Sequence, residues 1–98
     1  MTLAIRLREE ADLDLAEAAA WYELRRAGLG QAFLDEALSL LRSVATRPLS
    51  YPVVHRNTRR ALMGRFPFGV FYRVTSDQVV VVAVIHASRH PRYWKQRG

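Results

Sequence analysis

The chain of 98 residues contains no cysteine, which excludes disulfide bonds and thiolate chemistry. Its longest apolar run is far shorter than the roughly 18 residues that a membrane-spanning helix needs. The N-terminal segment also lacks the basic-then-apolar order of a signal peptide. We therefore expect a cytoplasmic protein, and the length predicts one domain that spans residues 1–98.

Acidic residues are almost missing from the second half of the chain. Residues 56–98 hold nine Lys or Arg and one acid, Asp77, whereas residues 1–55 hold six Lys or Arg and eight acids. The two parts therefore carry +8 and −2, which give the net charge of +6. A field of one sign steers anionic partners, so RNA, DNA and an acidic protein segment are all candidates. The alternative is a solvated basic surface without a partner.

Several catalytic motifs are absent as well. Gly28 and Gly30 match neither a dinucleotide fingerprint nor a phosphate-binding loop. No acid is placed to orient a histidine beside a serine, which argues against a Ser–His–Asp triad. His86 and His90 have neither a cysteine nor a nearby acid to complete a metal site. We therefore expect no metal and no cofactor.

What the sequence does contain is a block of three β-forming runs. Arg59–Met63, Phe68–Val74 and Val79–Ala87 are rich in β-branched and aromatic residues, and the polar segment Thr75–Gln78 predicts a hairpin between the last two. The third run has seven consecutive apolar residues, which indicates a strand that is covered on both faces at the centre of the sheet. Gly69 marks a bulge or a close approach of another group.

The first half predicts a strand followed by two helices. Thr2–Arg8 alternates apolar and polar residues, as an edge strand does, and the segments Glu9–Arg26 and Gln31–Thr46 carry apolar stripes at helical spacing. Gly28 is expected to cap the first helix, and Val53–Thr58 is interpreted as a polar loop. The order β-α-α-β-β-β predicts an α+β fold, with a helical hairpin packed on one face of an antiparallel sheet.

Metal-free RNA cleavage is the enzymatic option that these residues permit. It needs a base, an acid and cations that stabilise the phosphorane. The candidates are His86 or His90, Tyr93, and Arg60, Arg65 or Arg89. As alternatives, His86 is a strand-end residue bonded to the backbone, and the aromatic pair Tyr93 and Trp94 folds back over the sheet. For the pair we favour this packing interpretation over base stacking.

An ordered set of motifs resembles the RelE/ParE toxins of bacterial type II toxin–antitoxin modules. The first half carries Ala11-x-x-Asp14-Leu15, Trp21-Tyr22, Gly28-Leu29-Gly30-x-x-Phe33, Pro48 and Tyr51-Pro52. The second half carries Arg59-Arg60-Ala61-Leu62-Met63, Phe66-Pro67-Phe68-x-Val70-Phe71-Tyr72-Arg73-Val74 and Val82-x-x-Ile85-His86-x-x-Arg89-x-Pro91-x-x-Trp94. The resemblance covers nearly the whole chain. It implies the fold predicted above and a small toxin that an antitoxin holds inactive.

The resemblance also implies two targets, because RelE-like members cut mRNA on the ribosome whereas ParE-like members inhibit DNA gyrase. Arg60, Arg89 and Tyr93 match the RelE-like site, and His86 is a possible substitute for a missing group. Leu62, Gly69 and Ala87 stand where RelE-like members carry cations. Two missing guanidiniums would cost roughly several kcal/mol of transition-state stabilisation. We therefore favour ParE-like gyrase inhibition in a plasmid-stabilisation role. The alternatives are a RelE-like mRNA endonuclease and a non-toxic interaction module.

The expected partner is an antitoxin with an acidic, amphipathic segment that folds on the toxin and forms a hetero-oligomer with it. No membrane partner is expected. The candidate antitoxin contacts are Leu3, Leu7, Leu15, Tyr22, Leu34, Leu38, Arg59 and Arg60. The candidate target contacts are Arg65, Arg73, His86, Arg89 and Trp94.

Overall fold

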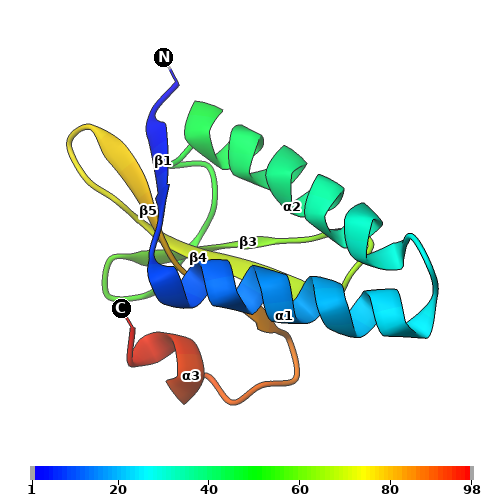
Figure 1. The fold of residues 1–98 in the computed structure, drawn as a ribbon. Helices are drawn as coiled ribbons and strands as arrows, with labels where there is room; N and C mark the ends of the chain where they lie inside the picture. The colour runs from blue at the N-terminus through cyan, green and yellow to red at the C-terminus, as the bar shows by residue number, and fades with distance from the viewer. Residues whose placement is uncertain (1, 98) are drawn as a thin grey trace.

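The computed structural model describes residues 2–97 and shows an α+β fold, as predicted (Figure 1). The elements are β1 (Ala4–Leu7), α1 (Glu9–Arg25), α2 (Leu29–Thr46), β2 (Val53–His55), β3 (Thr58–Leu62), β4 (Phe68–Val74), β5 (Gln78–His86) and α3 (Arg92–Lys95). The antiparallel helices α1 and α2 cover one face of a five-stranded sheet, and the short α3 lies on the other side (Figure 1). Among the described residues, no helix combines the length and the apolar character that crossing a membrane requires.

The strand order is β1-β5-β4-β3-β2, with β1 parallel to β5 and all other neighbours antiparallel. The prediction that the first strand lies at an edge is confirmed. The prediction that the apolar run occupies the centre is wrong, because β4 is the middle strand and β5 is second from the edge. Burial on both faces requires only a strand on each side and cover above and below. β4 pairs along β5, β1 pairs with its first part up to Val81, and a core covers each face, so Val79–Ile85 is buried throughout.

The segment Val53–Thr58 is not the loop that its polar residues predict. Val53–His55 forms strand β2, which pairs with β3 through Val53 opposite Arg59 and His55 opposite Thr58. Arg56 takes a left-handed conformation with φ of 51° in the turn between the two strands. Two adjacent valines are sufficient for a short edge strand, and the polar residues that follow form the tight turn.

A β-bulge in β5 sets which residues face the helices. Phe71 pairs with Ala83 and Tyr72 with Val81, so Val82 is an extra residue on β5. Val79, Val81 and Val84 belong to the core beneath the helices, whereas Val80, Val82, Ala83 and Ile85 belong to a second core on the opposite face. Without the bulge, Val84 and His86 would share the face of Val80 and Val82. The bulge therefore turns the end of β5 toward the helical hairpin.

Gly69 is a site of close approach and not the bulge itself. A Cβ atom at this position would lie 3.3 Å from both Cγ and Cδ of Arg60 on the neighbouring strand. The Arg60 side chain therefore lies across Gly69 on the face away from the helices, where the Phe71 ring also lies.

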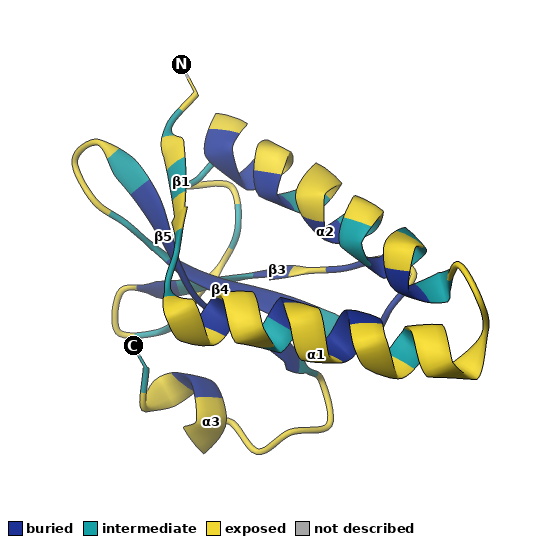
Figure 2. Ribbon diagram, in the orientation of Figure 1, coloured by how far each residue is buried: buried dark blue, intermediate teal, exposed yellow. Residues whose placement is uncertain are grey.

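The larger core lies between the helical hairpin and the sheet, as the buried faces in Figure 2 show. Its aromatic centre packs the ring of Phe33 against Tyr22, Phe66 and Phe68, with ring centroids 5.0–5.5 Å apart. On the opposite face Trp94 stacks on Phe71 with centroids 4.5 Å apart. The predicted return of the tail over the sheet is therefore confirmed for Trp94.

The turn between α1 and α2 depends on one carboxylate and two glycines. Glu23 accepts hydrogen bonds of 2.9 Å from the backbone N–H groups of Gly28 and Gly30. Gly28 has φ of 87° and is the N-cap of α2, not the C-cap of α1 that the sequence indicated. A Cβ atom on Gly30 would lie 2.4 Å from the carbonyl oxygen of Ala19, so only glycine permits this helix contact.

Candidate functional site

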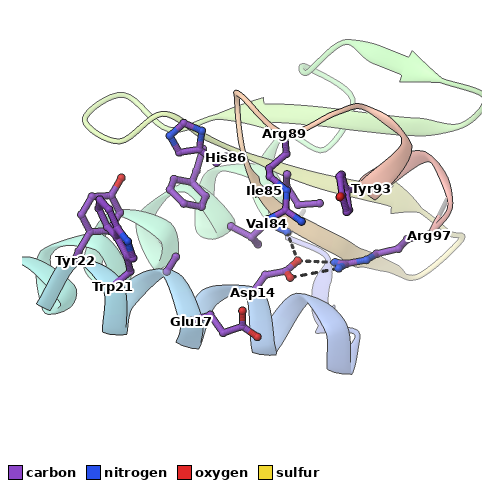
Figure 3. A pocket seen from close by; sticks show the side chains of 12 residues that line it. Asp14, Glu17, Trp21, Tyr22, Val84, Ile85, His86, Arg89, Tyr93 and Arg97 are labelled. Carbon is purple, nitrogen blue, oxygen red and sulfur yellow. Dashed lines mark hydrogen bonds and ion pairs between the residues drawn. The ribbon is translucent and has the colours of Figure 1, made fainter. Parts of the chain in front are cut away.

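Among residues 2–97, the edge of β5 has no neighbouring strand beyond the end of β1. There its backbone groups bond to two side chains that are distant in the sequence. Arg8 N–H donates to Val81 O at 3.0 Å, at the end of the pairing with β1. Three residues further on, Val84 N–H donates to the Asp14 carboxylate at 2.9 Å. Arg97 pairs with the same carboxylate at 2.5 Å (Figure 3). It also donates to Val82 O at 3.3 Å. Asp14 and Arg97 thus satisfy backbone groups that a neighbouring strand would otherwise satisfy.

The ion pair of Asp14 with Arg97 also holds the segment that follows α3. The Arg8 guanidinium donates to the carbonyl oxygen of Arg97 at 2.8 Å, and the side chains of Arg97 and Asp14 are 24% and 18% exposed. It is the only ion pair within 4.0 Å that residues 2–97 form. The tail from α3 to Arg97 is therefore held against β5 and α1.

A groove of about 380 Å³ opens beside this edge, between α1, the end of β5 and the segment that contains α3. We call it the β5 groove. Its lining is Asp14, Glu17, Ala18, Trp21, Tyr22, Phe68, Val84, Ile85, His86, Arg89, Tyr93 and Arg97 (Figure 3). It brings together three of the nuclease candidates, which are His86, Arg89 and Tyr93. The others, Arg60, Arg65 and His90, are not part of the lining.

His86 lies at the end of β5 and is bonded to the backbone. Its Nδ1 accepts a 3.0 Å hydrogen bond from Ser88 N–H and lies 2.8 Å from Ser88 Oγ. The ring also makes an edge contact with Phe68, with centroids 5.2 Å apart. Because Nδ1 is an acceptor here, the neutral ring carries its proton on Nε2. Only Nε2 remains available to a partner or substrate.

Tyr93 lies between two arginines at the outer end of the groove. The Arg89 guanidinium is 4.1 Å from the Tyr93 ring centroid, and that of Arg92 is 5.4 Å away. Hydrogen bonding from Arg92 and then from Arg89, together with their positive charges, lowers the pKa of the exposed Tyr93 phenol. This end of the groove is cationic, whereas Asp14 and Glu17 line it from α1.

The apolar antitoxin candidates fall into separate places. Leu3, Leu7 and Leu38 line a second groove of about 620 Å³ between β1 and α2, which we call the β1 groove. Leu34 is half-buried against the main core. Leu15 is buried in that core, so its proposed role as a contact does not fit its position. Tyr22 lines the β5 groove instead.

The basic candidates likewise lie in separate parts of the structure. Arg59 donates to the carbonyl oxygens of Tyr51 at 2.6 Å and Leu49 at 3.3 Å, so it holds the connector before β2. Arg60 and Arg73 are half-buried, and their positions on β3 and β4 put them on the face away from the helices. Arg65 is exposed in the turn between these strands, beside the Phe66 ring.

Trp94 does not fit its proposed role as a target contact, because it is buried against Phe71. Sequence reasoning also missed Glu17, Trp21 and Arg97 as parts of the β5 groove. Asp14 belongs to the motif set above, but no pattern indicated its function. Arg97 carried no signal either, since a cation near a chain end resembles a solvated tail.

Comparison with known proteins agrees with this architecture. The family model of the ParE toxin of the type II toxin–antitoxin system parDE matches residues 5–91. A search of curated proteins finds no match. Among solved structures, a chain of the chromosomal ParDE toxin–antitoxin system of P. aeruginosa superimposes with a TM-score of 0.66 at 18% identity. The match covers 87% of this chain and 96% of that one.

A chain of the RelBE2 toxin–antitoxin complex of Mycobacterium tuberculosis has the same fold, with a TM-score of 0.62 at 16% identity. Here 88% of this chain and 99% of the other are covered. At such identities the structures establish the fold, while the family model spans most of the sequence. The chain therefore belongs to the ParE toxin family of type II toxin–antitoxin systems.

Proposed function

We propose that this toxin acts by binding and inhibiting DNA gyrase, and that it does not cut RNA. The observation that carries the proposal is the separation of the nuclease candidates. The bulge at Val82 turns His86 toward the helices, whereas Arg60 lies across Gly69 on the opposite face. A cleavage site would need these groups around one phosphate, within hydrogen-bond reach of the reacting atoms.

The charges of the β5 groove support the same conclusion. The carboxylates of Asp14 and Glu17 line it together with Arg89 and Arg97. Arg97 is already paired with Asp14, and Glu17 offsets Arg89, so the groove offers an anionic substrate little net positive charge. A groove with both signs of charge and the exposed side chain of Trp21 is better suited to a protein segment.

The antitoxin that we propose carries an acidic, amphipathic segment. The β1 groove offers apolar anchors for it, with Leu3, Leu7 and the half-exposed Leu38 in its walls. Arg42 at the same groove supplies a cation for the acidic side of the segment. Apolar burial would limit dissociation, and the surplus of positive charge would accelerate association. We further propose a cytoplasmic location and a role in plasmid stabilisation.

The proposal is tested by expressing the chain alone in bacteria and measuring DNA synthesis and translation during arrest. We expect DNA synthesis to stop first, mRNA to remain intact, and co-expression of the antitoxin to restore growth. If translation stops first and ribosome-bound mRNA is cut, with the cuts lost in Tyr93→Phe, the RelE-like alternative holds. If the cells grow normally, the chain is an interaction module without toxicity.

A further inference from the structure

We propose that the face of the sheet away from the helices binds the phosphate backbone of duplex DNA. The pairing register places a single row of residues across all five strands. Arg6 is opposite Val80, Val80 is opposite Arg73, the same register continues to Thr58, and Thr58 is opposite His55. We call these residues the outer row. At the usual strand spacing it extends over roughly 19 Å.

Residues that pair across a sheet share one face, so the position of Val80 fixes the face of the whole row. Val80 belongs to the smaller core with Phe71 and Trp94, on the side away from the helical hairpin. Arg60 lies on that face too, two residues after Thr58 on β3. The outer row and Arg60 thus bring three arginines and a histidine together on one surface.

Several polar side-chain atoms of this surface have no partner in the part of the chain that the structure describes. The Nε atoms of Arg60 and Arg73 and the hydroxyl oxygen of the fully buried Thr58 have no hydrogen-bond partner among residues 2–97. Arg59, the neighbour of Arg60, faces the other way and donates to two backbone carbonyls. These atoms are buried, so a phosphate at the surface would meet the outer parts of the half-buried Arg60 and Arg73 side chains.

No carboxylate of residues 2–97 lies within 4.0 Å of the nitrogen atoms of these arginines. The single ion pair within residues 2–97 is that of Arg97 with Asp14, at the β5 groove. Asp77, the one acid after residue 55, lies in the β4–β5 turn beside Thr75. The outer row therefore presents unneutralised positive charge. A duplex displays on the order of ten phosphates over the same length.

The kind of surface favours duplex DNA over a protein or a single strand. Phe71, Val80 and Val82 of this face are buried, and Trp94 of α3 stacks on Phe71, so a protein partner would find few apolar groups besides the exposed Leu62 for the centre of an interface. Single-strand binding depends on exposed aromatic rings on which bases stack, and here Trp94 is already stacked on Phe71. Protein–DNA interfaces are polar and strongly positive, as this surface is.

The test measures binding of a labelled duplex of mixed sequence by fluorescence anisotropy at several salt concentrations, with neither gyrase nor antitoxin present. We expect the logarithm of the affinity to fall linearly with that of the salt concentration, by about 0.9 per phosphate neutralised. Arg6→Ala, an exposed position on an edge strand, should reduce this slope by about one. Arg73→Lys keeps the charge and should leave the slope unchanged.

The matched control is Arg26→Ala, which removes the same charge from the exposed end of α1. It should leave the slope unchanged. Equal losses in Arg6→Ala and Arg26→Ala would overturn the proposal, because only the net charge would then matter. Tighter binding of single-stranded RNA, or binding of polyglutamate without binding of the duplex, would overturn it too. The inference does not depend on the gyrase proposal, since the assay contains no gyrase.

Discussion

Removing the Asp14 carboxylate should lower the free energy of unfolding by more than is usual for a partly exposed ion pair. Asp14→Ala leaves the Val84 N–H without its acceptor and Arg97 without the ionic partner that it has among residues 2–97. Hydrogen bonds to charged groups contribute about 1.5–3 kcal/mol each, and loss of one partner of a fully buried pair costs about 3–5 kcal/mol. The remaining exposure of both side chains reduces these values, so we expect a loss of about 2–3 kcal/mol.

The measurement is urea unfolding followed by circular dichroism, with the midpoint lowered and the slope unchanged. Glu17→Ala is the control, because Glu17 is exposed on the same helix one turn later. Asp14→Asn should lose less than Asp14→Ala, since the amide oxygen still accepts from Val84. A double-mutant cycle with Arg97→Ala should show coupling between the two side chains. If Asp14→Ala were as stable as Glu17→Ala, the assigned role of this pair at the β5 edge would be refuted.

Three further predictions concern single side chains. Gly30→Ala should lower the unfolding free energy by about 1–3 kcal/mol in the same urea assay, because the added Cβ meets the Ala19 carbonyl oxygen. Burial raises the pKa of Tyr72 to about 12, so the neutral phenol stabilises the fold below pH 10, and this contribution is lost as pH rises toward 12. Tyr72→Phe should reduce that alkaline decline in measured stability, because only Tyr22, whose pKa burial also raises, then contributes to it in this way, and an unchanged decline would contradict the assignment. In a spectrophotometric titration Tyr93 should ionise before Tyr22 and Tyr72, and Arg92→Ala should return its pKa toward 10.0.

Local patterns predicted most of the elements because the periodicity of neighbouring residues determines where helices and apolar strands form. The stripe of Gln31–Thr46 and the apolar run after Gln78 each specify one element without reference to the rest of the chain. Strand β2 was missed because Val53 and Val54 are too short a run to outweigh the polar turn behind them. The position of β5 was misjudged because burial on both faces does not distinguish a middle strand from its neighbour.

The site was harder to predict because long-range pairing builds it. Asp14 and Arg97 are separated by 83 residues, and neither position has a local signal that indicates the other. The face of His86 depends on the bulge at Val82, in a run of similar residues where no glycine marks the extra position. The two-residue spacing in the sequence places Arg60 and Thr58 on one face of their strand. That His86 lies on the opposite face follows only from the bulge at Val82.

The most direct test of the central claim is an assay of DNA supercoiling by purified gyrase in the presence of the purified chain. The account predicts that micromolar toxin inhibits supercoiling and that the antitoxin restores it, while ribosome-bound mRNA stays intact under matched conditions. Unchanged supercoiling together with codon-phased cleavage of that mRNA would contradict the account, and would show that His86, Arg89 and Tyr93 form a cleavage site without Arg60.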